Sequence, residues 1–386
     1  MRLRCGRAMF ATLVLLAAQG ATAQLDETGN LAAARARHLR RGINTSMWFA
    51  QSPGNYSIER LRTYTTADDL VLIHRLGFDH IRLSVDADPL TAWQQGRPAG
   101  RDFMAELDKV VTKATGEGLA VIVDVHPETK YKQTLLQGTE GVRAFVSLWK
   151  TVAEHFKGTD PSLVFFEIMN EPEQTDAHRW EGIESSVAQA IRQMAPQHTI
   201  IATGARWSGL QDLLQLVPIG MDNVIYTFHD YDPFPFTHQG ATWTMPEVRP
   251  LRGVPYPSSP EAVEPVLAQE PTLAAQWFVE EYGLGRWDAA RLDAEITFAE
   301  KWGKQYGVPV YCGEFGVHKP YAKPEDRARW AHDLRVAFER HGIGWAMWDY
   351  QANFGVVTKS DGVTTPDRQM LEALGLTASD GGPASQ

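Results

Sequence analysis

The sequence predicts an α/β protein that forms a closed (β/α)8 (TIM) barrel with one enlarged unit. Apolar runs recur along the chain, a helical or loop segment follows each of them, and two of the runs end in a glutamate beside a proline or a glycine. Alternation of buried strands with amphipathic helices is typical of a parallel sheet covered by helices. Eight such units are the number that closes into a barrel.

The expected strands are short runs rich in Val, Ile, Phe and Leu with polar residues at their ends, as in strands that are buried on both faces. They cover residues 41–47, 80–85, 119–125, 162–169, 199–203, 224–229, 308–313 and 344–349. The carboxyl ends of parallel strands meet on one rim of a barrel. We therefore expect the residues that follow these runs to lie close together.

Amphipathic stretches fill several intervals between the strands and predict helices. The expected helices cover residues 67–76, 102–115, 140–156, 180–194 and 324–341. Glycine follows the pattern at Gly77, Gly116, Gly158 and Gly342, and glycine after the last helical residue is the usual stop signal.

The sixth unit is the enlarged one, with an insertion expected over about residues 233–306. A proline-rich stretch, 233–260, precedes a helical stretch, 261–306. Long connections at the rim of a barrel often form lids or binding walls. Trp243 and Tyr256 are therefore candidates for contact with a ligand, and packing of the insertion onto the barrel is the alternative.

The chain begins with the features of a secretory signal peptide over residues 1–23, because Arg2, Arg4 and Arg7 precede an apolar stretch and small residues follow it. A single domain is expected over 24–376 and a disordered tail over 377–386. The apolar stretch is shorter than the ~20 residues of a membrane span, and no later segment is apolar for that long. We expect export to the medium or the periplasm, with Cys312 as the one cysteine after cleavage.

Two glutamates lie at the ends of apolar runs, where the catalytic residues of a parallel barrel are expected. Asn170-Glu171-Pro172 ends the fourth apolar run, and Gly313-Glu314-Phe315-Gly316 ends the seventh. Hydrolysis of a glycosidic bond needs one carboxylic acid to protonate the leaving oxygen and one carboxylate at the anomeric carbon. A strand-end glutamate taken alone is more often a helix cap or a surface charge, but the pair at one rim predicts a glycosidase.

Composition agrees with a neutral substrate. The formal charge of −10 disfavours a nucleic-acid or anionic-membrane partner. The twelve tryptophans offer flat faces that suit both core filling and sugar stacking. We expect a polysaccharide or oligosaccharide partner, no nucleic acid and no membrane span. The oligomeric state is not encoded in any visible motif, and a monomer is the working expectation.

Further motifs occur in order along the barrel: Arg82 in Ile-Arg-Leu-Ser, His126 in Asp-Val-His, His229 and Tyr231 in Phe-His-Asp-Tyr, and Trp348 in Met-Trp-Asp. Together with the two glutamate motifs, this series resembles glycoside hydrolase family 5, the cellulase family, from about residue 42 to residue 354. The resemblance implies a retaining (β/α)8 glycosidase that needs no cofactor or metal and acts on β-linked glucans or mannans.

The resemblance also implies roles. Glu171 would be the general acid/base, with a pKa raised by its ionised neighbour, and Glu314 the nucleophile. Arg82 and Tyr231 would hold Glu314, and Asn170 would bond the sugar 2-hydroxyl. His126 and His229 would line the cleft. An ordinary salt bridge for Arg82 and a metal site at His126-Pro-Glu128 are the alternatives.

Substrate binding is assigned to Trp348, Trp207, Trp48 and Asn44. Trp348 would stack under the sugar nearest the bond that is cleaved, with Trp207 and Trp48 on either side; core packing is the alternative for these two. The sequence thus predicts an endo-acting hydrolase of β-1,4-glucan. Mannan, xyloglucan and mixed or β-1,3-glucan remain alternative substrates, and a glycan-binding barrel or a metal-dependent hydrolase remain alternative classes. Both glutamates are present, which disfavours the binding protein, and sensitivity to a chelator would favour the metal enzyme.

Overall fold

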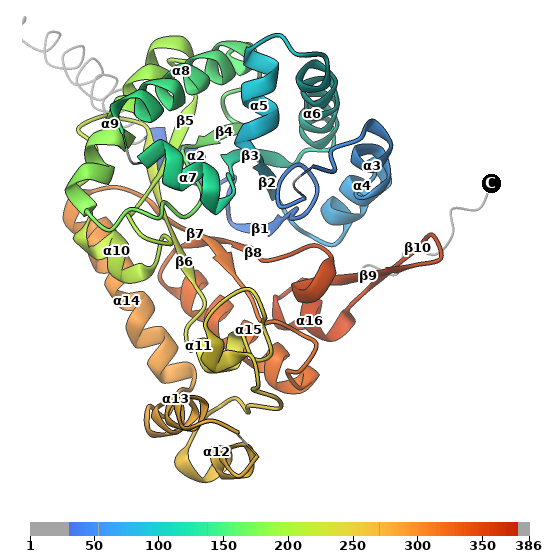
Figure 1. The fold of residues 1–386 in the computed structure, drawn as a ribbon, viewed down its shortest axis with the longest axis vertical. Coiled ribbons are helices and arrows are strands. Elements are labelled where there is room, and N and C mark those ends of the chain that lie inside the picture. Colours follow the sequence, from blue (N-terminus) through green and yellow to red (C-terminus); the bar gives the residue numbers. More distant parts are fainter. Residues whose placement is uncertain (1–30, 53, 137, 270, 377–386) are drawn as a thin grey trace, which may run out of the picture.

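The computed structural model describes residues 31–376 except residues 53, 137 and 270, so the predicted signal peptide and tail lie outside the described part. Eight parallel strands form a closed barrel in chain order, and each pairs with the next until β8 pairs with β1 (Figure 1). The strands are β1 Arg41–Asn44, β2 His80–Val85, β3 Ala120–Val125, β4 Val164–Glu167, β5 Thr199–Thr203, β6 Val224–Asp230, β7 Val310–Phe315 and β8 Gly344–Met347. The predicted (β/α)8 fold is confirmed.

The helices surround the strands, as the pattern of apolar positions predicts. In chain order they are α2 Leu31–Ala36, α3 Ile58–Thr63, α4 Ala67–Arg75, α5 Ala87–Gln94, α6 Pro98–Gly116, α7 Thr129–Leu136, α8 Thr139–Phe156, α9 Ala177–Met194, α10 Leu210–Gln215, α14 Ala289–Tyr306, α15 Pro324–Arg340 and α16 Arg368–Ala373. Gly77 and Gly342 take the positive φ of a helix stop, at 96° and 68°. Helix α6 instead runs through Gly116, and the positive φ falls on Gly118, at 87°.

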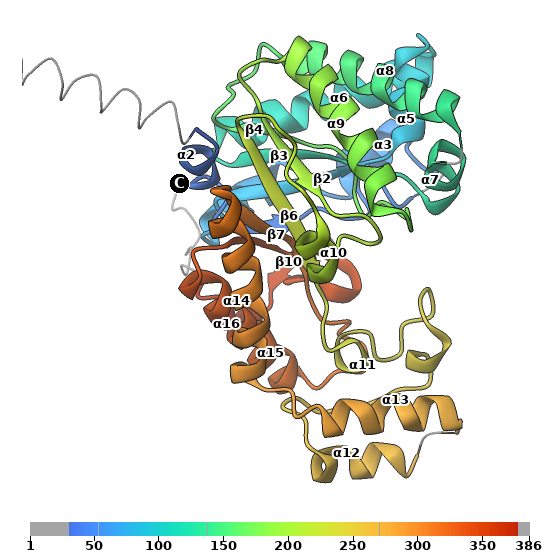
Figure 2. The same ribbon diagram turned by 90° about the vertical axis from the view of Figure 1, so that its left-hand side faces the viewer.

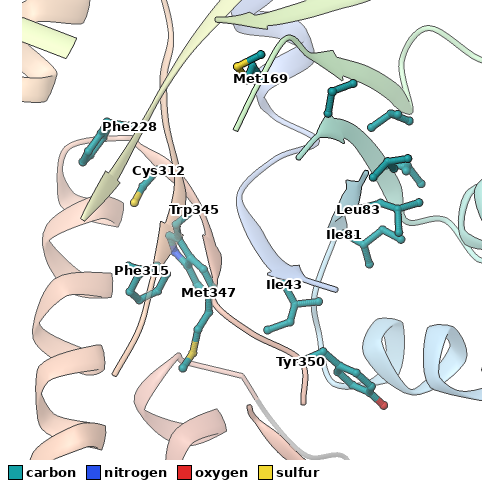
Figure 3. Packing of buried hydrophobic residues seen from close by; sticks show 14 of the residues in the cluster. Ile43, Ile81, Leu83, Met169, Phe228, Cys312, Phe315, Trp345, Met347 and Tyr350 are labelled. Carbon is teal, nitrogen blue, oxygen red and sulfur yellow. The ribbon is translucent and has the colours of Figure 1, made fainter. Parts of the chain in front are cut away.

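Apolar side chains fill both the space between strands and helices and the barrel interior. Figure 3 shows part of the larger cluster, in which Phe315, Trp345 and Met347 of β7 and β8 pack together. A second cluster joins Ala32 and Leu39 at the amino end to inward-facing strand residues such as Ile122 and Phe165. The interior is therefore a packed core, and a substrate must bind above it at the carboxyl ends of the strands.

The long connection after β6 contains α11 Phe234–Thr237, a 3-10 turn Pro246–Val248, α12 Pro260–Leu267 and α13 Leu273–Leu284, before α14 packs against α15. Helices α12 and α13 pack on each other and lie outside the ring of barrel helices (Figure 2). The extra structure thus precedes α14, which belongs to the ring itself.

A two-stranded antiparallel sheet of β9 Val357–Ser360 and β10 Val363–Pro366 follows β8. Asp361 and Gly362 join the strands with φ values of 52° and 78°. An Asp-Gly pair with two positive φ values is the usual two-residue hairpin turn, so the dipeptide was an available signal that our prediction did not use. Among the described residues, no helix is long and apolar enough to cross a bilayer.

Candidate active site

Glu314 lies within β7 and Glu171 lies on the loop that follows β4. The pairing of β7 with β8 shifts register between Cys312 and Phe315, and a local bulge of this kind redirects side chains at a strand end. Gly313 has no room for a side chain, because an added Cβ would stand 2.7 Å from Thr227 Oγ1. The bulge and the glycine together place the Glu314 carboxylate on the rim.

Three groups converge on the Glu314 carboxylate. Arg82 Nη1 donates to Oε1 at 2.6 Å, and the Tyr231 hydroxyl donates to Oε2 at 2.9 Å. His229 Nδ1 stands 3.6 Å from Oε2. Burial, then the charges of Glu314 and Glu171, raise the pKa of Tyr231 well above its ordinary value, so its proton stays available to donate. The hydrogen bonds from Arg82 and Tyr231 fix the orientation of the carboxylate.

Arg82 is fully buried and binds more than the one carboxylate that the sequence analysis gave it. Its guanidinium donates to both oxygens of Glu167, at 2.8 and 2.7 Å, and lies 3.1 Å from Asp124. Burial alone would lower the pKa of Arg82, but Asp124, Glu167 and Glu314 together raise it well above its ordinary value. Our sequence prediction missed Glu167 and Asp124, although a charged residue inside an apolar strand was the signal.

Glu171 has a different environment. His229 Nδ1 lies 2.9 Å from its Oε1, and about a quarter of the side chain remains open to solvent, 26%. Burial is the main cause that raises the pKa of Glu171, and Glu173 adds to it, whereas Lys132, His126 and Arg82 oppose the rise. The expected raised pKa is therefore present, but its cause is desolvation and not mainly the charge of Glu314. A carboxyl group of this kind stays protonated to higher pH.

Two histidines are held in neutral form beside the glutamates. Burial lowers the pKa of His126 to about 3 and that of His229 to about 4. His126 Nδ1 is 2.9 Å from Asp124, and its Nε2 is 3.1 Å from Asn170 Nδ2. Asn170 Oδ1 also accepts from Arg82 at 3.0 Å. The network thus orients Asn170 at the rim, next to Glu171 in the chain.

Two tryptophans that follow strand ends reach the surface of the protein. Trp348 follows β8, is partly exposed, and stacks on His126 with ring centroids 5.8 Å apart. Trp207 follows β5 and is 61% exposed. Its φ of 28° and the φ of 43° at Glu171 lie in the left-handed region, which costs a non-glycine residue about 1–3 kcal/mol. Backbone strain thus coincides with two predicted site residues.

Three residues offered above as substrate contacts are buried, and for Trp48 and Tyr256 burial corresponds to the packing alternative. Trp48 is 2% exposed and donates from Nε1 to the Leu61 carbonyl at 2.7 Å, so it packs in the core. Asn44 is fully buried and bonds Arg82 and the Gly313 carbonyl, so it supports the site from below. Tyr256 is 1% exposed and donates to Asp333. Trp243, the other insertion candidate, is 59% exposed beside His318.

The two glutamates and His229 form a compact group. One atom from each of Glu171, His229 and Glu314 lies within 4.8 Å of those of the other two, a spacing that would also suit a metal ion. The donor set does not favour one, since Arg82 and Tyr231 already donate to both oxygens of Glu314. A cation there would face the guanidinium at close range.

A barrel rim that holds one carboxyl group with a raised pKa beside a second, ion-paired carboxylate has the arrangement of the glycosidases. The family comparison agrees: residues 40–354 match the model of the cellulase family, glycosyl hydrolase family 5. The chain belongs to this family and is a glycoside hydrolase.

Curated proteins with low sequence identity to this chain include endoglucanases and a cellodextrinase. Endoglucanase C of Acetivibrio thermocellus is 27% identical over 319 residues, which cover 81% of this chain and 91% of the relative. Cellodextrinase A of Ruminococcus flavefaciens is 29% identical over 318 residues, 80% and 84% of the two chains. Endoglucanase 3 of Fibrobacter succinogenes is 26% identical over 362 residues, 87% of this chain, and the match spans 53% of that longer relative.

Solved structures that superpose on this chain include an endoglucanase. Endoglucanase Cel5A of Thermotoga maritima superposes with a TM-score of 0.70 at 28% identity, covering 89% of this chain and 99% of that one. The same protein has been solved in complex with mannotriose, with a TM-score of 0.69 at 27% identity over 88% and 99% of the chains.

Proposed function

We propose that this enzyme is a retaining endo-β-1,4-glucanase that cleaves cellulose-like chains by double displacement, with Glu314 as nucleophile and Glu171 as general acid/base. The observation that carries the proposal is the spacing of the two carboxylates, with one oxygen of each within 4.8 Å of the other. Retaining glycosidases hold their carboxyl groups about 5–5.5 Å apart, whereas inverting enzymes leave about 6.5–9.5 Å for a water molecule.

In the first step Glu314 attacks the anomeric carbon and Glu171 gives its proton to the leaving oxygen. Arg82 and Tyr231 hold the Glu314 carboxylate in one orientation for the attack. Burial keeps the Glu171 proton in place at higher pH than usual. The carbon–oxygen bond of the glycoside breaks as the ester bond to Glu314 forms, so the products are a glycosyl-enzyme and a shortened chain with a free hydroxyl.

In the second step the ionised Glu171 takes a proton from water, and that water attacks the anomeric carbon and releases Glu314. The negative charge of Glu314 is absent in the ester, which favours ionisation of Glu171 at this stage. Two displacements at the same carbon restore the β configuration. His229, which faces both carboxylates, stays neutral and supports each protonation state of Glu171 through a hydrogen bond.

Substrate would be held by Asn170 and by the aromatic rings. Asn170 is oriented by Arg82 and His126 toward a hydrogen bond with the 2-hydroxyl, which strengthens as charge develops on the ring. Trp348 would stack under the sugar nearest the cleavage point and Trp207 under the leaving-group side. The printed names of the relatives, endoglucanases and a cellodextrinase, support a β-glucan.

Mannan is the second candidate substrate, since the similar Cel5A was solved with mannotriose as well as with cellobiose. The chemistry at the two glutamates would be identical. We further propose that the enzyme acts outside the cytoplasm, because residues 1–23 have the features of a signal peptide. A monomer stays the working expectation.

The test is reducing-sugar release by the purified protein from soluble β-1,4-glucan, β-1,3-glucan, mannan and xyloglucan, with and without a chelator. Chelator-insensitive cleavage of β-1,4-glucan with a rapid fall in viscosity supports the endo-glucanase. Cleavage of mannan alone would replace the substrate, and no cleavage of any polymer would contradict the proposal.

Roles are tested with a cellobioside that carries an activated leaving group. E171Q should keep the first step with this substrate while losing polysaccharide cleavage, because the activated group needs no proton. E314Q should lose both activities. Equal losses in the two variants on both substrates would contradict the assignment.

A further inference from the structure

Helix α7, which follows β3, contains a buried lysine. Lys132 is 4% exposed, and its Nζ lies 3.6 Å from Glu173 Oε1. The same Glu173 oxygen accepts from Thr129 Oγ1 at 2.7 Å. Lysine is rarely buried unless it is paired. Glu173 therefore connects α7 to the loop after β4.

That loop carries Glu171, and Pro172 separates it from Glu173. Glu171 has a left-handed φ of 43°, a conformation that persists where surrounding contacts hold it. Thr129 and Lys132 supply such contacts from a neighbouring unit of the barrel. A shift of Glu173 would move Glu171 with it, because the proline between them restricts the backbone.

The pair also acts through its charges. Burial raises the pKa of Glu171, and Glu173 raises it further. Lys132 lowers this pKa more than His126 or Arg82 does. The remaining groups around Glu171 come from β2, β3, β6 and β7 and the segments that follow them: Arg82, Asp124, His126, His229, Tyr231 and Glu314.

We propose that Lys132 and Glu173 are positioning residues for Glu171, an ion pair that anchors its loop to α7 and balances a cation against an anion beside its carboxyl group. The inference rests on the proposed role of Glu171 as general acid/base. Neither side chain touches the reacting atoms. Their function is to keep Glu171 able to donate a proton in the first step and accept one in the second.

The test is the pH profile of kcat/KM on an unactivated cello-oligosaccharide, whose cleavage requires protonated Glu171. Activity is lost on the alkaline side as Glu171 ionises. K132M removes the cation, which destabilises the ionised carboxylate, so the alkaline limb should move up by about 0.5 pH units or more. E173Q removes the anion and should move the same limb down.

The inference predicts that the alkaline limb moves up in K132M and down in E173Q. A merely structural role would lower kcat/KM without changing the pH at which the limb falls. K132R keeps the charge and should restore the wild-type profile. K109M is the matched control: it removes a lysine of α6 that is 61% exposed and paired with Glu106, and its profile should stay in place. E173Q retains the buried lysine and keeps the test informative if K132M does not fold.

Unmoved limbs in both K132M and E173Q, or displacements in the same direction, would overturn the inference. The proposed function is checked separately in E171Q, which should keep the first step on the activated substrate while losing cleavage of the cello-oligosaccharide. If E171Q cleaved the cello-oligosaccharide at the wild-type rate, the assignment of Glu171 would be the claim that failed.

Discussion

The buried guanidinium of Arg82 offers the sharpest prediction. The side chain is fully buried and pairs with three carboxylates, at 2.6 Å to Glu314, 2.7 Å to Glu167 and 3.1 Å to Asp124. R82M would leave these acids in a low-dielectric interior without their cation. Removing one partner of a buried ion pair costs about 3–5 kcal/mol of unfolding free energy.

The change should be visible in thermal unfolding. One kcal/mol corresponds to about 2 °C in Tm for a domain at the larger end of the usual range, so R82M should lower Tm by about 6–10 °C. R62M is the matched control, because Arg62 pairs with Glu106 at 2.6 Å but is 57% exposed. An exposed pair contributes about 0.2–1 kcal/mol, so R62M should lower Tm by about 2 °C or less.

Unfolding of both variants would be followed by circular dichroism at neutral pH, with glycosidase activity measured on the same samples below the transition. R82M should be inactive even while folded, since Glu314 loses its cation. A Tm for R82M within about 2 °C of wild type, or equal to that of R62M, would refute the view that the guanidinium organises the carboxylates.

The remaining predictions concern the aromatic residues and pH. W207A should lower kcat/KM on soluble glucan by about 10-fold at unchanged Tm, because an exposed stacking ring contributes about 1–1.5 kcal/mol; an unchanged kcat/KM would remove Trp207 from the binding site. W48A should instead cost about 3–5 kcal/mol in denaturant unfolding, as for a buried core residue, and a cost below about 1 kcal/mol would contradict that placement. Because burial raises the pKa of Glu171, kcat/KM should persist above the pH at which an ordinary glutamate ionises and fall as pH rises through that raised value. A pH profile that declines already from about pH 5 upward would contradict this.

Much of the barrel was predictable because buried parallel strands leave a direct trace in the sequence. The runs at 80–85 and 199–203 were placed to the residue, since Val, Ile and Leu end there against polar or small residues. Glu171 and Glu314 could be found for a related reason: each follows or ends such a run, and topology brings those ends to one rim.

The residues that the sequence left open belong to types that occur both in cores and in binding sites. A tryptophan near a strand end fits a core or a sugar platform equally well, and the burial of Trp48 and exposure of Trp207 depend on loop geometry that the sequence does not encode. Asn44 was placed in the substrate site because local sequence does not reveal which way a strand-end amide points. Glu167 and Asp124 escaped notice because their partner, Arg82, is distant in the chain.

The central claim is that Glu314 forms a covalent bond with the sugar. A cellobioside with fluorine at C2 and an activated leaving group slows the second step, so the glycosyl-enzyme accumulates and its peptides can be mapped by mass spectrometry. We predict one equivalent of label, located on Glu314 and absent in E314Q. Label on another residue, or turnover with inversion and no covalent species, would contradict the account.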